Sequence, residues 1–257
     1  MEDRRIDNRL AVLIDADNVP YANIKEMMEE IAKNGTPTIK RIYADWTKPT
    51  VSGWKNVLLE NAITPIQQYS YTSGKNSSDS ALIIDAMDIL YTGKVDGFCI
   101  VSSDSDFTRL ATRLRESGMK VIGIGEKKTP TPFITACDKF IYIEILKKID
   151  EKPKSIELKT TKETATISSK TEKASQYNNY NLWKLISESV SDLADESGWT
   201  FLADLGNFIL KKKPDFDPRN HGFTKMLPLI KSLEKFEIDE RVTGVSNTRH
   251  IYIKNKY

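Results

Sequence analysis

Apolar segments of strand length alternate with helix-length segments through the first 146 residues of the chain. Strands are expected at residues 10–15, 38–44, 64–69, 97–102, 119–125 and 140–145, and helices from about Pro20 and over 52–61, 78–91, 104–116 and 132–137. This alternation predicts an α/β fold in which a parallel sheet carries helices on both faces. The segments 10–15 and 97–102 are almost entirely apolar, which is typical of central strands covered on both sides.

The composition changes after residue 146. Lys, Glu, Ser and Thr dominate residues 147–177, and because such a segment cannot bury a core, we expect a flexible linker there. Residues 178–257 then show helix patterns at 182–196, 202–212 and about 225–235, and paired strand patterns at 236–242 and 248–254. Three helices followed by a hairpin indicate a small winged-helix domain. A chain of 257 residues is long enough for both domains.

The composition also limits the chemistry that this chain can perform. Cys99 and Cys137 lie in apolar surroundings and are expected to be buried and reduced, and His221 and His250 lack the spacing of metal ligands or of a catalytic triad. No apolar run approaches the roughly 18 residues that a membrane span needs, and the N-terminus lacks an apolar signal segment. We therefore expect a cytoplasmic protein without a membrane partner, in which any catalysis depends on carboxylates.

Acidic residues stand where the predicted strands end. Asp15 and Asp17 close the first strand, Asp104 and Asp106 close the fourth, and Asp79 opens a helix. In open α/β sheets the first and fourth strands commonly lie side by side, and ligands bind beyond their carboxyl ends. Carboxylates gathered in one crevice repel one another unless a cation neutralises them, and oxygen ligands without His or Cys select Mg²⁺ or Mn²⁺. Asp15 and Asp104, which end the two strands, are the expected direct ligands.

Helix capping is the simpler interpretation of each acid taken alone. Asp104 precedes a helix, Asp79 lies in a first turn, and Asn18 can cap the helix that starts near Pro20. Capping does not require a doubled acid such as Asp104 with Asp106, and this favours a metal site. On the helix that Asp79 opens, we expect Asp88 on the solvated face. We expect Asp85 at most to contact the metal ligands, not to bind the metal itself.

Three sequence motifs together resemble the NYN domain, a PIN-like, Rossmannoid group of ribonucleases that includes the LabA-like proteins. They are L-I-D-A-D-N, G-K-N-S-S-D-S-A-L-I-I-D-A-M-D and I-V-S-S-D-S-D-F, within residues 1–146. The resemblance implies a metal-dependent nuclease that hydrolyses RNA phosphodiester bonds, with Asp15, Asp79, Asp104 and Asp106 as catalytic and metal-binding acids and Asn18 as their polar neighbour. The family often has glycine where this chain has Ser103, which puts the geometry of that turn in question.

Residues 178–257 resemble the OST-HTH/LOTUS module. The resemblance rests on A-D-E-S-G-W-T-F-L-A-D-L-G-N-F-I-L-K-K-K-P-D-F-D-P-R-N-H-G-F-T-K and implies RNA binding or the docking of a protein partner. Trp199, Leu205, Phe208 and Ile209 are expected in its core. Pro228 is unexpected within a helix, where it would clash with the carbonyl of Thr224, so the third helix should start later or kink.

Basic residues are the candidate contacts to RNA. The formal net charge of +2 does not by itself indicate a nucleic-acid partner, so any basic surface must be local. Lys75 precedes Asp79 in a loop that should open on the acidic crevice, where a lysine can meet a phosphate. In the second domain the candidates cluster around the loop before the third helix and beside the hairpin: Lys211, Lys212, Lys213, Arg219, His221, Lys225, Arg241 and Arg249.

Two other functions are compatible with part of the pattern. Asp15-Ala-Asp17-Asn-Val19 matches the opening D-x-D-x-[TV] motif of haloacid-dehalogenase-type phosphatases, but only Glu126 is offered where that family needs a later acidic pair. The second alternative is an inactive scaffold that binds RNA or protein through the C-terminal domain, against which the complete acid set argues. The sequence leaves open the RNA substrate, the number of metal ions and the oligomeric state.

Overall fold

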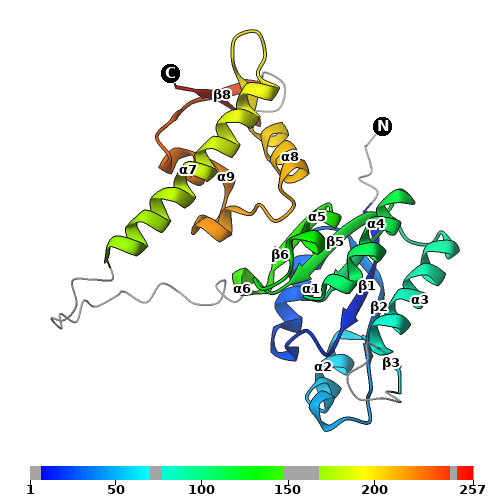
Figure 1. Ribbon diagram of the computed structural model, residues 1–257. Helices are drawn as coiled ribbons and strands as arrows, with labels where there is room; N and C mark the ends of the chain where they lie inside the picture. The colour runs from blue at the N-terminus through cyan, green and yellow to red at the C-terminus, as the bar shows by residue number, and fades with distance from the viewer. Residues whose placement is uncertain (1–6, 70–76, 147–167, 244–247, 257) are drawn as a thin grey trace. The chain divides into compact units, whose positions relative to one another are not determined.

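A computed structural model describes residues 7–69, 77–146, 168–243 and 248–256 of the protein (Figure 1). The contacts between residues divide the chain into two compact units, Met1–Lys152 and Pro153–Tyr257, called the first and the second unit below. In the part of the chain that the structure describes, no helix has both the length and the apolar character that crossing a membrane requires.

The first unit contains a parallel sheet of six strands in the order β3-β2-β1-β4-β5-β6. The strands are β1 (Arg9–Asp15), β2 (Thr36–Ala44), β3 (Thr64–Gln67), β4 (Gly97–Val101), β5 (Lys120–Gly125) and β6 (Lys139–Tyr142). The predicted parallel sheet is confirmed, and so is the prediction that the first and fourth strands are neighbours. Their carboxyl ends therefore open on the same edge of the sheet.

Helices cover both faces of this sheet because the side chains of β1 alternate between two separate hydrophobic clusters. Leu10, Val12 and Ile14 face one cluster, and Ala11 and Leu13 face the other. The first cluster is closed by α1 (Ile24–Ala32), which follows η1 (Tyr21–Asn23), and by η2 (Pro49–Val51), α2 (Trp54–Asn61) and α6 (Ile143–Leu146). The second is closed by α3 (Ser77–Thr92), η3 (Ser105–Phe107), α4 (Thr108–Glu116) and α5 (Thr131–Ala136).

The end of the first unit differs from the sequence prediction. The last strand was expected over residues 140–145, but β6 ends at Tyr142 and α6 begins at Ile143. Turning into a helix lets Ile143, Ile145 and Leu146 all be buried in one cluster, whereas a continued strand would direct Ile145 and Leu146 to opposite faces. Cys99 and Cys137 are buried free thiols, as expected.

The second unit combines three α-helices with a three-stranded antiparallel sheet in the order β7-β9-β8. Its elements are α7 (Ser168–Leu193), β7 (Thr200–Phe201), α8 (Leu202–Lys212), η4 (Pro218–His221), α9 (Met226–Ser232), β8 (Phe236–Thr243) and β9 (Thr248–Asn255). The helices bury one cluster against one face of the sheet, with Ile186, Leu205, Ile209, Ile230 and Ile253 among its members. Three helices and a hairpin agree with the predicted winged helix.

Several boundaries in the second unit depart from the predicted ones. α7 begins at Ser168, inside the segment expected to be a linker, and residues 147–167 of that segment lie outside the described residues. α9 begins at Met226, so Pro228 falls in the first turn, where a backbone N–H has no partner within the helix. Trp199 and Phe208 were expected in the core, but both are only partly buried and neither is a member of the core cluster.

Candidate active site

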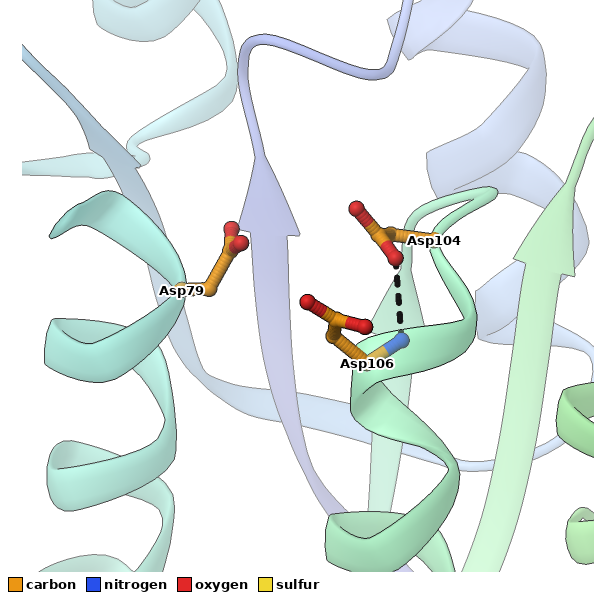
Figure 2. A group of neighbouring side chains, drawn as sticks. All are labelled: Asp79, Asp104 and Asp106. Carbon is orange, nitrogen blue, oxygen red and sulfur yellow. Dashed lines mark hydrogen bonds between the residues drawn. The ribbon is translucent and has the colours of Figure 1, made fainter. Parts of the chain in front are cut away.

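Three carboxylates meet beyond the carboxyl ends of the central strands of the first unit. Oxygen atoms of Asp79, Asp104 and Asp106 all lie within 4.8 Å of one another. Figure 2 shows the side chain of Asp79, from the first turn of α3, facing those of Asp104 and Asp106, which follow β4. Asp79 is buried, Asp104 is half-buried and Asp106 is exposed, so this carboxylate group reaches from the protein interior to the surface.

Asp104 both caps the start of η3 and belongs to the carboxylate group. Its backbone is extended, and its Oδ1 accepts a hydrogen bond of 2.9 Å from the backbone N–H of Asp106, at the start of η3. That bond uses one carboxylate oxygen of Asp104 and fixes the side chain beside Asp106. The cap interpretation of Asp104 is therefore correct, and the same cap places the residue in the carboxylate group.

Asp15 occupies a different position at this edge of the sheet. It ends β1, is 1% exposed, and does not belong to the group formed by Asp79, Asp104 and Asp106. Its Oδ2 accepts hydrogen bonds from Asn18 Nδ2 at 2.7 Å and from Ser102 Oγ at 2.8 Å. Its Oδ1 accepts one from the backbone N–H of Asp17 at 3.2 Å. Asn18 thus contacts an acid of the site, and the role of Asp15 as a direct metal ligand stays a prediction.

The electrostatics of the site follow from burial and from the density of like charge. Burial, followed by the charges of Asp15, Asp104 and Asp106, raises the pKa of Asp79 to about 6. Burial also raises the pKa of Asp15, although its hydrogen bonds from Asn18 and Ser102 act in the opposite direction. Burial and the neighbouring carboxylates thus both favour the protonated form of Asp79, and a bound cation would act against both.

Two serines after β4 connect the acids to the neighbouring segments. Ser102 Oγ donates to Asp15 and accepts a hydrogen bond of 3.1 Å from the backbone N–H of Asp104. Ser103, at the position where the family often has glycine, accepts a hydrogen bond of 2.9 Å from the backbone N–H of Glu126. The connecting role of Ser102 was not predicted from the sequence, although its place directly after β4, the strand paired with β1, is a usable signal.

The remaining candidates of the first unit are structural or lie outside the described residues. Lys75 lies outside the described residues, because the structure does not describe residues 70–76. Asp88 is exposed, as expected. Asp85 accepts hydrogen bonds from the guanidinium of Arg41 and the hydroxyl of Tyr43, both on β2, and burial together with Asp85 raises the pKa of Tyr43. Asp85 therefore fastens α3 to β2.

Several of the predicted basic contacts in the second unit are already engaged by acids of the same unit. Lys212 forms an ion pair of 2.6 Å with Asp192, and Arg219 forms one of 2.7 Å with Asp217. Arg241 pairs with Asp239 at 2.7 Å, and Arg249 lies 3.7 Å from Glu240. Of the other four candidates, Lys211, Lys213 and Lys225 are exposed. His221 is half-buried, and this burial lowers its pKa.

The phosphatase interpretation lacks its second half in the described structure. β5 ends at Gly125, and Glu126, the acid that follows it, forms an ion pair of 2.6 Å with Lys128. Ser102, which that interpretation would use to bind phosphate, is fully buried and bonded to Asp15. Neither residue is placed to serve that chemistry.

Comparisons with known proteins agree with the two units. Residues 9–144 match the NYN domain and residues 181–248 match the OST-HTH/LOTUS domain. No curated protein matches the sequence. Among solved structures, a protein of unknown function from Vibrio parahaemolyticus is 21% identical with a TM-score of 0.45, covering 56% of this chain and 96% of its own. An uncharacterized protein from Nitrosomonas europaea is 23% identical with a TM-score of 0.28, covering 43% of this chain and 90% of its own. On the NYN match, which spans more than half of its residues, the chain belongs to the NYN domain family, with an OST-HTH/LOTUS domain following.

Proposed function

We propose that the first unit is a metal-dependent ribonuclease that hydrolyses phosphodiester bonds of RNA. The observation that carries the proposal is the carboxylate group of Asp79, Asp104 and Asp106 at the carboxyl edge of the sheet. NYN domains are generally nucleases, and this chain belongs to that family. The OST-HTH/LOTUS match supports RNA as the nucleic acid.

The donor set of the site fits Mg²⁺ or Mn²⁺. Asp79, Asp104 and Asp106 offer carboxylate oxygens, and no His or Cys belongs to this group of described residues. Hard oxygen ligands of this kind suit Mg²⁺ and Mn²⁺. Such an ion, when bound, would activate water and neutralise charge on the phosphate. Burial and then the surrounding like charges raise the pKa of Asp79 to about 6, and a divalent ion would offset those charges.

Asp15 would act as a positioning residue for this group. Ser102 Oγ donates to Asp15 and receives the backbone N–H of Asp104, so the end of β1 holds the turn that carries Asp104. Asn18 Nδ2 fixes the same Oδ2 atom of Asp15 from the other side. These bonds keep Asp104 in place and leave the oxygens of Asp79 and Asp106 directed toward it.

The second unit would hold the RNA while the first unit cuts it. OST-HTH/LOTUS domains bind RNA, and both units belong to one chain, so the second contact is intramolecular and even a weak one raises occupancy. The exposed side chains of Lys211, Lys213 and Lys225 are the basic candidates for phosphate contacts. Docking of a protein partner through this unit is the alternative that the tests must separate.

The decisive test is cleavage of labelled single-stranded RNA with Mg²⁺ or Mn²⁺, with EDTA as the metal-free control. We expect Asp79→Asn and Asp104→Asn to lower the rate by at least about 100-fold, because each loses a charge at the metal while the shape is preserved. Asp88→Asn is the matched control, since Asp88 is an exposed acid on the same helix as Asp79. Wild-type activity in both site variants, or no metal-dependent cleavage by the wild type, would refute the nuclease and leave the scaffold.

Truncation after Lys152 tests the role of the second unit. We expect the truncated chain to cleave short oligomers almost as fast as the full chain, and to bind long RNA more weakly in a salt-dependent manner. Equal affinity of both chains for long RNA would show that the second unit docks something other than this RNA.

A further inference from the structure

The sheet of the second unit has one face on the core and one face turned away from it. Thr200 and Ile253, which are paired in the sheet, are both buried on the core side. The next pair, Phe201 and Tyr252, therefore points to the opposite face, as does His250 two residues along β9. An open face of an antiparallel sheet normally carries polar residues. Aromatic rings at this place are a departure that the core does not explain.

The rings on this face form a continuous series. The Phe201 ring lies 5.2 Å from the His250 ring in a stacked arrangement and 5.6 Å from the Tyr252 ring. Trp199 precedes β7, and the Arg241 guanidinium lies over both its ring and that of Tyr252. All four side chains are partly exposed, and none belongs to the core cluster. We call Trp199, Phe201, His250 and Tyr252 the aromatic face.

Two cations of the chain border the aromatic face. The Arg241 guanidinium lies 4.2 Å from the centre of the Tyr252 ring and 5.5 Å from that of Trp199. Lys254 Nζ lies 5.8 Å from the centre of the Trp199 ring and donates a hydrogen bond to the Ser197 carbonyl. Cations of the chain itself thus lie over the rings of Trp199 and Tyr252, so a base that stacks at this face meets the planar guanidinium of Arg241 together with the rings.

We propose that the aromatic face binds unpaired bases of single-stranded RNA by stacking. This inference rests on the proposed function, in which the chain acts on RNA, and it assigns the single-strand contact to the open sheet face. Every base has a π-face, so a row of half-exposed rings on a sheet receives successive bases without reading their sequence. Arg241 adds a planar cation beside Tyr252, which stacks on bases in the same way.

The charges on this face indicate that stacking, more than phosphate attraction, supplies the affinity. Arg241 forms its ion pair with Asp239, and Glu237 is the register partner of Lys254. Cations and acids are therefore balanced on the face. Lys211 and Lys213, at the end of α8, are by contrast exposed cations. We therefore expect RNA binding at these lysines to depend more strongly on salt than RNA binding at the aromatic face.

The surroundings of Trp199 leave room for a nucleotide. Trp199 borders an open hollow of about 840 Å³ at the β8 edge, which Lys231 and Lys256 also line, together with Glu234. A hollow of this size lies within the range of ordinary ligand sites. A base stacked at Trp199 can extend its sugar and phosphate into it.

The experiment measures binding of a fluorescein-labelled single-stranded 20-mer RNA by anisotropy, with the full-length protein in EDTA so that no metal-dependent cleavage occurs. We expect Tyr252→Leu to weaken binding by about 5- to 150-fold, which corresponds to the loss of one stacked base, without changing the salt dependence. Tyr252→Phe keeps the ring and should bind like the wild type. Tyr180→Leu removes a ring that is 56% exposed on α7, outside the aromatic face, and should have no effect.

A second variant guards against misfolding. Trp199→Leu should reproduce the loss in affinity, and thermal unfolding should show each variant folded. Unchanged affinity of folded Tyr252→Leu and Trp199→Leu for the single strand would overturn the proposal, as would equal losses for a perfectly paired duplex. Because the assay needs no cleavage, a wild type that binds through these rings but fails to cut RNA would refute the nuclease and leave this inference standing.

Discussion

The two sheets of this protein are covered differently, and their functional residues lie in correspondingly different places. In the first unit, hydrophobic clusters cover both faces of the parallel sheet, so the acids gather at the carboxyl edge, where Asp15 and Asp104 end neighbouring strands. In the second unit, one cluster covers one face, and the other face displays Phe201 and Tyr252. A sheet buried on both sides leaves only its edges for ligands, whereas a half-covered sheet offers a surface.

This difference in cover separates the proposed site of RNA cleavage from the proposed surface for RNA binding. A carboxylate group needs side chains that converge on a point, which strand ends and helix starts provide. Retention of a flexible strand needs a surface along which several similar contacts follow one another. If the covered and the open surfaces differ in this way, substitutions at the two surfaces should have different effects.

The largest expected difference between the two sheets is the loss in the free energy of unfolding when an aromatic ring is removed. Phe98 is fully buried between the sheet and its helices, so Phe98→Ala should lower the free energy of unfolding by about 3–5 kcal/mol. Tyr252→Ala, on the open face, should lower it by less than about 1 kcal/mol. Urea unfolding followed by circular dichroism measures both. Similar losses would show that the open face is a core surface.

The next effect concerns the link between β1 and the acidic turn. Ser102→Ala removes one hydrogen bond to the buried carboxylate of Asp15 and the acceptor for the N–H of Asp104. We expect a loss of about 1–3 kcal/mol in the free energy of unfolding, together with slower cleavage. Ser105→Ala changes an exposed serine of the same turn and should alter neither. A Ser102→Ala variant that keeps the wild-type rate of cleavage would mean that these two hydrogen bonds do not position Asp104.

A smaller effect is the pH dependence that Asp79 imposes on the metal-free protein. Its pKa is raised from 3.8 to about 6 in the folded protein, so folding favours the protonated form. The stability that this proton provides is complete below about pH 4 and is lost as the pH rises through 6. The loss should be about 1 kcal/mol, because water partly screens the site.

Comparison of the wild type with Asp79→Asn isolates that contribution. The melting temperature of the wild type should fall, relative to the variant, between pH 4 and pH 7, and Mn²⁺ should restore it only in the wild type. If the melting temperatures of the wild type and Asp79→Asn change in parallel with pH in the absence of metal, the charges around Asp79 are already neutralised.

The smallest effect is expected at the basic end of α8. Lys213→Ala removes an exposed cation and should reduce the salt dependence of RNA binding by about 0.7 in slope, the contribution of one phosphate contact to a single strand. Tyr252→Leu should leave this slope unchanged. Binding titrations at several KCl concentrations distinguish the two, and an identical slope for Lys213→Ala would exclude it as a phosphate contact.

The adjacency of the first and fourth strands and the location of the acids could be predicted, because they follow from local patterns and from a general rule for open α/β sheets. The apolar segments around Val12 and Cys99 identify central strands, and central parallel strands end at one edge. The partners of Asp15 could not be predicted, because they depend on how Ser102 and Asn18 turn after their strands. Trp199 was misplaced for a related reason: alternation assigns Trp199 and Phe201 to one face and Thr200 to the other, but does not say which face is covered.

The attachment of α3 to β2 has a consequence for the evolution of the site. Asp85 holds Arg41 and Tyr43, and it follows Asp79 by six residues, or about 9 Å along the helix. A change at Arg41 alone would leave the half-buried carboxylate of Asp85 without its ion pair and weaken the attachment of α3, so that Asp79 could shift away from Asp104. Arg41 and Asp85 should therefore covary among relatives that retain the acids, so that a sequence that has replaced only one of the pair marks a lineage in which the spacing of the carboxylates is no longer under selection.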